Sequence, residues 1–399
     1  MKFLLIYVPN LRFTNLNKLV KVRLGDICTI TGGYAFDSLK MTQKGEYQII
    51  KMGNLYNGIF DLSRNSSFIN APTKKELDYL IQENDILITL TGTTNKKDYG
   101  YTVQMEQPKN LLLNQRCALI RASKVNEKYL FYLLNSNDFL KQFYASSTGG
   151  TGNQTNVSIN DMLDFKVCIS NENDQLKISN ILSALDKKIL TQIKIIDDLV
   201  LQKKYIISSL LKSIQDNEKI MLKDILFDYN IKTTINNEYP VLSSTASGMY
   251  LQSDYFNKET SSDNTIGYKI VPRGYCTYRS MSDTGLFTFN IQNLVEKGIV
   301  SPAYPVFSSN DDYINEFIIL YLNNSSYIKK QILELKSGGT RFALPFSTLC
   351  TLKIPKLEKE KQLSLIKTIT AFERKIENEE IILNALHQQK IFLLNNMFI

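Results

Sequence analysis

The chain has 399 residues, of which 43% are hydrophobic and 22% charged, a composition typical of globular proteins. This length suggests two or three domains, and the net charge of +8 fits a polyanionic partner without requiring one. There is no Trp and one His, so a catalytic triad, a histidine metal site or a histidine general base would depend on His387 alone. We expect His387 to be a solvated helix residue.

The N-terminal segment and the cysteines indicate a cytoplasmic protein. The apolar start at residues 3–8 is too short for a signal sequence, and no run approaches the ~18 apolar residues of a membrane helix. The five cysteines form no Cys-x-x-Cys motif, which favours single thiols in a reducing compartment.

Strand-like and helical segments alternate along the chain. Apolar and β-branched runs bounded by Gly, Asn or charged residues predict strands at 47–50, 85–90 and 118–120. Amphipathic periodicity predicts helices at 129–144 and 314–335, each leading into a Gly-Gly-Thr loop. The predicted fold class is therefore α+β, with mixed α/β domains.

The two halves of the chain repeat each other. Gln175 corresponds to Gln362, and the same sequence offset aligns residues 185–189 with 372–376 and Tyr205 with Phe392. The offset drifts upstream, as expected where loops differ in length. A repeat this long indicates a duplicated domain, because solenoid repeats span about 20 to 50 residues.

Residues 178–210 and 365–397 carry the alternating three- and four-residue spacing of a coiled-coil seam. Polar residues interrupt both seams at the same register, Gln192 with Glu379 and Lys203 with Lys390. We therefore expect the two helices to pair, each seam about 48 Å long; the alternative is that each packs on its own domain. The predicted seam residues are Ile178, Leu182, Leu185, Ile189, Ile196, Leu199, Ile206, Leu210, Leu365, Ile369, Phe372, Ile376, Leu383, Leu386, Leu393 and Met397.

Several segments around these helices resemble the DNA specificity subunits of type I restriction-modification enzymes. Residues 9–13 and 22–27 look like the start of the family's target-recognition domain, and the loop at 149–157 looks like its end. Residues 238–244 and 267–274 are similar to family segments of the second half. The resemblance covers essentially the whole chain, because length, duplication and paired helices agree.

The resemblance implies two target-recognition domains, residues 1–171 and 215–357, that each read half of a split, asymmetric DNA sequence. Antiparallel spacer helices at 172–214 and 358–399 would hold them apart and dock two methyltransferase subunits, with motor-nuclease subunits joining later. The assembly would methylate adenine with S-adenosylmethionine or cleave DNA with ATP and Mg, all bound by partner subunits. This chain itself would be non-catalytic and hold no cofactor or metal.

The motifs of the chain agree with a non-catalytic role. It contains no Gly-x-x-x-x-Gly-Lys-Ser/Thr phosphate loop, no Gly-x-Gly-x-x-Gly and no Asn-Pro-Pro-aromatic segment. A non-catalytic adaptor with two lobes on a coiled coil remains the alternative, since it would share the duplication.

Candidate DNA-binding residues have side chains that suit phosphates or base edges and lie in polar loops. Each has a structural alternative: a solvated turn for the loop at 91–99, a helix C-cap for the glycine loops and a surface ion pair for each Arg. Arg341 is favoured because it closely follows two glycines. The first-half candidates are Thr91, Thr93, Thr94, Asn95, Lys96, Lys97, Tyr99, Asn114, Arg116, Gln154 and Asn156; those of the second half are Ser243, Ser244, Thr245, Arg273, Tyr278, Arg279, Ser280, Thr340 and Arg341.

Overall fold

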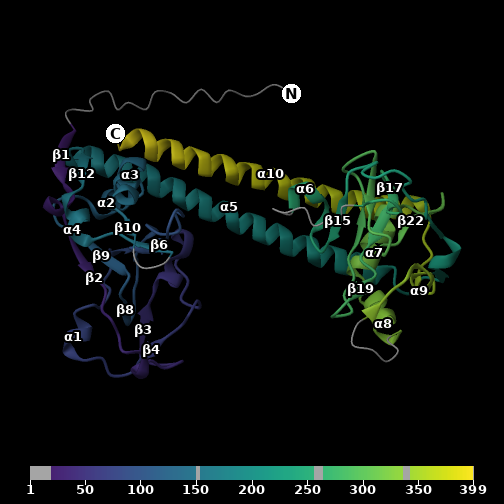
Figure 1. Cartoon of the computed structure of the whole chain (residues 1–399), viewed down its shortest axis with the longest axis horizontal. Coiled ribbons are helices and arrows are strands. Elements are labelled where there is room, and N and C mark those ends of the chain that lie inside the picture. The colour runs from purple at the N-terminus through teal and green to yellow at the C-terminus, as the bar shows by residue number, and fades with distance from the viewer. Residues whose placement is uncertain (1–18, 150–152, 256–263, 336–341, 399) are drawn as a thin grey trace. The chain divides into compact units, whose positions relative to one another are not determined.

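The computed structural model describes residues 19–149, 153–255, 264–335 and 342–398, which fall into two compact units. The first unit comprises Met1–Ile193 with Ile382–Ile399, and the second comprises Lys194–Ile381. Two long helices, α5 (Glu172–Ser213) and α10 (Lys359–Met397), each belong partly to one unit and partly to the other (Figure 1). This division differs from the predicted boundaries, which assign each long helix to a segment of its own.

The first unit is built on a four-stranded antiparallel sheet with the strand order β2-β9-β5-β7. Two three-stranded sheets, β4-β3-β8 and β10-β11-β6, and the pair β1-β12 complete its strands. The strands are β1 (Val20–Arg23), β2 (Cys28–Gly32), β3 (Tyr47–Ile50), β4 (Phe68–Ile69), β5 (Ile86–Thr89), β6 (Thr91–Thr93), β7 (Thr102–Gln104), β8 (Leu111–Leu113), β9 (Cys117–Ala122), β10 (Thr148–Gly149), β11 (Gln154–Asn156) and β12 (Lys166–Ile169). The three predicted strands are confirmed as β3, β5 and β9.

The second unit has the four-stranded sheet β14-β22-β18-β20 and four two-stranded pairs, β13-β24, β15-β16, β17-β21 and β19-β23. Its strands are β13 (Lys219–Met221), β14 (Leu226–Asp228), β15 (Leu242–Thr245), β16 (Gly248–Leu251), β17 (Lys269–Pro272), β18 (Cys276–Tyr278), β19 (Met281–Ser282), β20 (Phe289–Ile291), β21 (Lys297–Val300), β22 (Val306–Ser309), β23 (Phe342–Ala343) and β24 (Lys353–Pro355).

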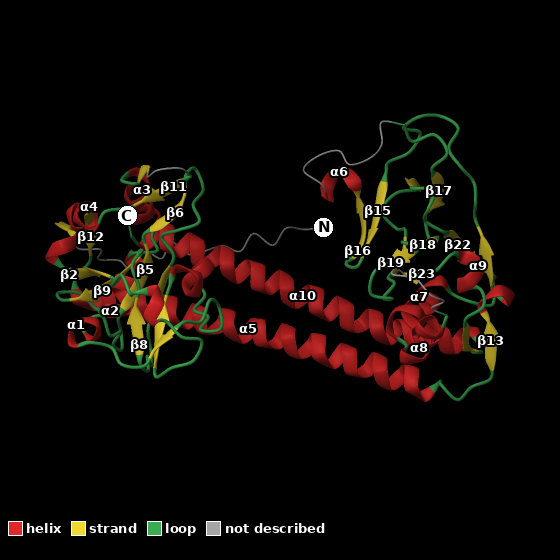
Figure 2. Ribbon diagram, turned by 60° about the horizontal axis from the view of Figure 1, so that its bottom comes forward, coloured by secondary structure: helices red, strands yellow, loops and turns green. Residues whose placement is uncertain are grey.

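Short helices pack beside these sheets, whereas α5 and α10 are long and uninterrupted (Figure 2). The short helices are α1 (Lys74–Leu77), α2 (Glu127–Leu133), α3 (Asn137–Ala145), α4 (Ile159–Asp164), α6 (Gln252–Tyr255), α7 (Asn315–Asn324), α8 (Ser326–Glu334) and α9 (Phe346–Leu349). No helix in the described ranges is long and apolar enough to cross a membrane.

Each of the two predicted amphipathic helices is a pair of shorter helices, which corrects both predictions. Ser136 caps the start of α3 by accepting a hydrogen bond from the backbone of Phe139. Ser325 caps α8 in the same way, through the backbone of Ile328. A serine side chain that satisfies the first free N–H groups starts a new helix, and the apolar period continues across the break.

The same hydrogen bonds recur in the two units at matching positions. Gln175 of α5 accepts a hydrogen bond from the backbone N–H of Asn126 at 3.0 Å, at the start of α2. Gln362 of α10 accepts one from the backbone N–H of Ile314, also at 3.0 Å, at the start of α7. A buried glutamine therefore ties each long helix to the equivalent short helix of its unit.

A second glutamine repeats in the same manner. Gln142 of α3 exchanges two hydrogen bonds with the backbone of Lys166 in β12, at 2.9 and 3.0 Å. Gln331 of α8 exchanges two with the backbone of Lys353 in β24, at 3.0 and 2.8 Å. The predicted duplication is confirmed, because both halves repeat this framework of side-chain contacts.

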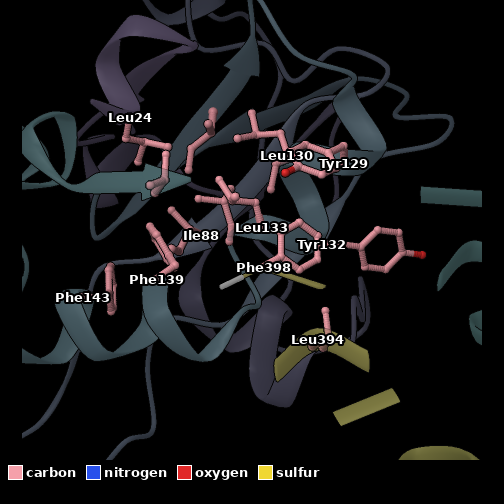
Figure 3. Packing of buried hydrophobic residues seen from close by; sticks show 14 of the residues in the cluster. Leu24, Ile88, Tyr129, Leu130, Tyr132, Leu133, Phe139, Phe143, Leu394 and Phe398 are labelled. Atoms are coloured by element: carbon pink, nitrogen blue, oxygen red, sulfur yellow. The ribbon is translucent and has the colours of Figure 1, made fainter. Parts of the chain in front are cut away.

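The core of the first unit includes the ends of both long helices. Ile178 and Leu182 of α5 share one apolar cluster with Leu394 of α10 and with Phe398 just beyond it. Figure 3 shows Leu394 and Phe398 at this cluster. The start of α5 therefore meets the end of α10, so the two helices run antiparallel within this unit. The predicted pairing is confirmed, and both helix ends also pack against the domain.

In the second unit the end of α5 meets the start of α10. Ile207 and Leu211 lie in the same buried cluster as Ile369. The predicted seam residues Ile206 and Leu210 are less buried than these two neighbours, so the side of α5 that faces the domain core lies one residue further along. This shift corrects the seam at its end, because the domain core, rather than the partner helix alone, selects the buried side.

Candidate DNA-binding surfaces

The predicted polar loop of the first half forms part of a small sheet. Strand β6 pairs antiparallel with β11, which places Thr93 beside Gln154 and Thr91 beside Asn156. The Thr91 hydroxyl donates to Asn156 Oδ1 at 2.9 Å. The fold thus brings together two predicted segments that are far apart in the sequence.

The turn that follows β6 is held by hydrogen bonds to a carboxylate. The carboxylate of Asp98 accepts hydrogen bonds from the Thr93 N–H at 2.8 Å and from the Thr93 hydroxyl at 2.7 Å. These two hydrogen bonds hold the pKa of Asp98 below its ordinary value of 3.8, and the bond from the backbone N–H has the larger effect. A Cβ at Gly92 would lie 2.2 Å from Tyr99 Cδ1, so only glycine fits beneath the turn.

Four residues at the tip of this turn, Thr94, Asn95, Lys96 and Lys97, are exposed. We call residues 91–98 with 154–156 the hairpin surface. Asn95 adopts a left-handed conformation with φ of 64°, and Lys97 Nζ lies 5.2 Å from the centre of the Tyr144 ring, a cation–π contact. Two ammonium groups on a rigid turn suit the phosphates of a nucleic acid.

Arg116 lies next to the hairpin surface. Its carbonyl accepts a hydrogen bond from the N–H of Leu90, the residue before β6. Its side chain is exposed and its φ is 72°, a conformation that costs free energy in a residue with a Cβ. Asn114, also a predicted residue, is half-buried.

Neither predicted tyrosine is accessible to DNA, which corrects both predictions. Tyr99 is 3% exposed and its ring packs against Phe143, with the ring centres 5.7 Å apart. Tyr278 is 0% exposed and its hydroxyl donates to the Leu344 carbonyl at 2.8 Å. Both rings point into the core although their neighbours in sequence are polar.

Four residues predicted in the second half, Ser243, Ser244, Thr245 and Arg279, line one pocket of about 500 Å³. Sequence reasoning missed the other polar residues of this pocket, although the hydroxyl-rich stretch at 280–288 is a signal that points to them. We call this site the β15–β19 pocket; its further polar lining consists of Ser282, Asp283, Thr284, Thr288 and Tyr304.

Asn290 of β20 supports the β15–β19 pocket from behind. Its side-chain nitrogen donates to Ser244 Oγ at 2.8 Å and to the Thr245 carbonyl at 2.9 Å. The hairpin β15-β16 is therefore tied to the central sheet of the unit.

The other predicted residues of the second half are engaged or not described. The Ser280 hydroxyl donates to the Ala303 carbonyl at 2.9 Å. Arg273 pairs with Glu296, with Nε 2.7 Å from Oε1, and donates to the Asn293 carbonyl. Arg273 therefore makes the surface ion pair that was the alternative to DNA contact. Thr340 and Arg341 lie outside the described residues, as do residues 9–13.

Reactive and metal-binding groups are scarce in the described ranges. No group of three or more His, Cys, Asp or Glu side chains there is arranged to hold a metal ion. Burial raises the pKa of the Cys28 and Cys117 thiols to about 12, so both are protonated at neutral pH.

Comparison with known proteins finds a family model that matches the part of the chain holding the hairpin surface. Residues 17–199 match the family model of the type I restriction modification DNA specificity domain. The matched range covers just under half of the chain. The hairpin surface lies entirely inside it, and the resemblance seen in the sequence is confirmed.

The fold of the whole chain is similar to solved structures. One is the S subunit of a type I restriction-modification system from M. genitalium, with 16% identity over 98% of this chain and 99% of that chain and a TM-score of 0.54. Another belongs to a study of complex assembly and conformational transition of the type I R-M system, with 14% identity, coverage of 96% and 98% and a TM-score of 0.59. The fold similarity extends beyond the matched specificity domain to the second unit, and the predicted α+β class is confirmed.

Proposed function

We propose that this chain is the DNA specificity subunit of a type I restriction-modification system and that each unit reads one half of a split, asymmetric DNA target. The observation that carries this proposal is a repeated framework with two different polar surfaces. The glutamine hydrogen bonds recur in both units, whereas the hairpin surface presents the exposed Lys96 and Lys97 and the β15–β19 pocket presents Arg279 among hydroxyl groups. Equivalent scaffolds with different surfaces suit two different half-sites.

The two surfaces offer different recognition chemistry. In the first unit Lys96 and Lys97 would contact phosphates, while Gln154 and Asn156 present amides that can pair with adenine edges. In the second unit Arg279 presents a guanidinium suited to the O6 and N7 acceptors of guanine. Asp283 on the same pocket wall would accept a hydrogen bond from a base amino group and repel phosphate.

The paired helices would dock two methyltransferase subunits, one on each unit. Tyr205 and Phe392 are related by the repeat, and they are 75% and 48% exposed. The repeat also relates two exposed basic pairs, Lys187-Lys188 in the first unit and Arg374-Lys375 in the second. Exposed aromatic and arginine side chains are typical anchors of protein interfaces, and their duplication fits two copies of one partner.

In this proposal the chain supplies recognition and its partners supply the chemistry. S-adenosylmethionine would bind to the methyltransferase subunits, and ATP and Mg to motor-nuclease subunits, in the cytoplasm. A protein adaptor that binds no DNA is the competing function. It is distinguished by duplex binding, since a DNA reader loses affinity steeply as salt rises and an adaptor shows no binding at any salt concentration.

The decisive experiment is co-expression of the chain with a candidate methyltransferase subunit, followed by sequencing of the methylome. We expect methylated adenines in a motif of two short specific parts separated by a non-specific gap. Methylation confined to one contiguous motif would contradict two half-sites. A matched variant with Lys96 and Lys97 changed to alanine should reduce methylation of the same motif.

A further inference from the structure

A tyrosine ties the first unit to its helical arm. Tyr132 of α2 is 3% exposed and lies at the edge of the core beside Leu133 (Figure 3). Its hydroxyl donates to Asp186 Oδ2 of α5 at 2.9 Å, and Ser183 Oγ lies 3.3 Å from the same hydroxyl oxygen. Burial raises the pKa of Tyr132 above its ordinary value of 10.0, so this phenol is a neutral hydrogen-bond donor.

The second unit keeps the acceptors but not the phenol. The repeat that aligns the core residues of α2 and α7 puts Leu320 where the first unit has Tyr132. The offset that relates Gln175 to Gln362 puts Thr370 and Glu373 of α10 at the positions of Ser183 and Asp186. A hydroxyl and a carboxylate therefore remain, opposite a side chain that is shorter and apolar.

A pocket of about 290 Å³ lies at this position in the second unit. Its apolar lining comes from Ile319 and Leu320 of α7 and from Ile366 and Ile369 of α10, and Thr370 and Glu373 supply polar atoms. We call it the α7–α10 pocket. It combines an apolar floor with a hydrogen-bond acceptor, the two features that a phenol ring satisfies in the first unit.

We propose that the α7–α10 pocket binds a tyrosine side chain presented by a methyltransferase subunit. The ring would cover the apolar floor and its hydroxyl would donate to Glu373, as Tyr132 donates to Asp186. Glu316 on the pocket wall disfavours an anionic ligand. Glu373 pairs with Lys203 as Asp186 pairs with Lys390, so the two units offer a phenol the same kind of acceptor. The identity of the partner rests on the proposed function, whereas the preference for a phenol does not.

The proposal makes the two methyltransferase contacts unequal. The first unit fills this position with its own Tyr132, so a partner subunit finds no pocket there. The second unit leaves it open. Two copies of one methyltransferase would therefore use the same tyrosine at only one of their two contacts.

The first experiment uses p-cresol as the probe and the full chain as the protein. Isotope-labelled methyl groups of Leu320, Ile366 and Ile369 report binding by NMR. We expect saturable shifts with p-cresol and binding about tenfold weaker for toluene, which lacks the hydroxyl. Glu373→Gln should narrow that difference. Absence of saturable binding to the wild-type chain, or equal binding of the two probes, would overturn the preference for a phenol.

The second experiment fills the pocket from within. Leu320→Tyr should abolish p-cresol binding and raise the melting temperature, which also shows that the variant folds; Leu320→Met is the matched control. In assembly with the methyltransferase subunit, wild type and Leu320→Met should bind two copies, and Leu320→Tyr should bind its second copy at least tenfold more weakly. Unchanged affinity for the second copy would rule out a partner tyrosine in this pocket. Failure of the wild-type chain to bind any methyltransferase would instead reject the proposed function and, with it, this partner.

Discussion

Lys390 Nζ lies 2.6 Å from Asp186 Oδ1 in the first unit, and the repeat relates this ion pair to Lys203 and Glu373 of the second unit, 3.3 Å apart. The same sequence offset carries Asp186 to Glu373 and Lys203 to Lys390. Because α5 and α10 are antiparallel within each unit, both seam lysines face an acid of the other helix. The polar interruptions of the two seams at Lys203 and Lys390 thereby form matched cross-helix pairs.

Double-mutant cycles on these two ion pairs should give unequal coupling free energies. Both side chains of the Asp186–Lys390 pair are less than a third exposed, whereas Glu373 is 55% exposed. A double-mutant cycle with Asp186→Asn and Lys390→Met should give a coupling of about 1 kcal/mol, and the cycle at Glu373 and Lys203 about half of that, because solvent screens the second pair. Urea unfolding at low salt measures both; equal couplings would contradict this ranking.

Gln362 should be among the residues most sensitive to truncation. It is 0% exposed, accepts from the Ile314 N–H and donates to the Leu357 carbonyl at 2.8 Å. Gln362→Ala leaves buried backbone groups without partners, so we expect about 2–3 kcal/mol of destabilisation. Gln202→Ala on the exposed side of α5 should change the free energy of unfolding by less than about 0.5 kcal/mol. Comparable losses for the two variants would argue against the anchoring role.

Lys96 and Lys97 should contribute to DNA affinity without setting the sequence read. Alanine at both positions should weaken binding of the assembled complex to specific and random duplexes alike. It should also lower the slope of log affinity against log salt by about 2, one for each lost phosphate contact. Lys141→Ala is the matched control, because Lys141 pairs with Asp138 elsewhere in the same unit. A salt slope that does not change would exclude phosphate contacts by this turn.

Asp98 should make the hairpin surface sensitive to acid. Its pKa is lowered in the folded chain, so its stabilisation is complete above the unfolded value, near 3.8, and is lost as pH falls through the lower folded value. Asp98→Asn should cost about 1 kcal/mol at pH 7 and progressively less below pH ~4. Amide hydrogen exchange at Thr93 against pH measures this; a pH-independent difference between variant and wild type would rule out the carboxylate as the cause.

Substitutions of Arg279 and Arg273 should affect target recognition differently, although both residues are DNA-binding candidates by sequence. Arg279 lines the β15–β19 pocket, whereas Arg273 is held by Glu296. Arg279→Ala should reduce affinity for the cognate target about 10- to 100-fold and relax the motif at one position of the second half-site. Arg273→Ala should leave the motif unchanged. Methylome sequencing of both variants tests this difference. A relaxed motif with Arg273→Ala would show that Arg273, and not Arg279 alone, reads the target.

The sequence by itself determined the features that depend on local or periodic patterns. The strand at 47–50 appears with those bounds as β3, and the recurring seam, with its polar interruptions at the same register in both halves, predicted the pairing of the two long helices. Family resemblance in the first half is likewise a property of consecutive residues, and residues 17–199 match the specificity domain. These features survive folding because each is carried by neighbouring residues or by a regular spacing.

Only the tertiary structure decided which side chains lie together and which face inward. Tyr99 and Tyr278 sit in polar stretches, yet each is buried because its ring fills space left by distant core residues. The hairpin surface joins residues 91–98 to 154–156 through strand pairing, and the α7–α10 pocket brings Leu320 of α7 together with Thr370 and Glu373 of α10. Such outcomes depend on volumes and partners far away in the sequence, which no local pattern of residues contains.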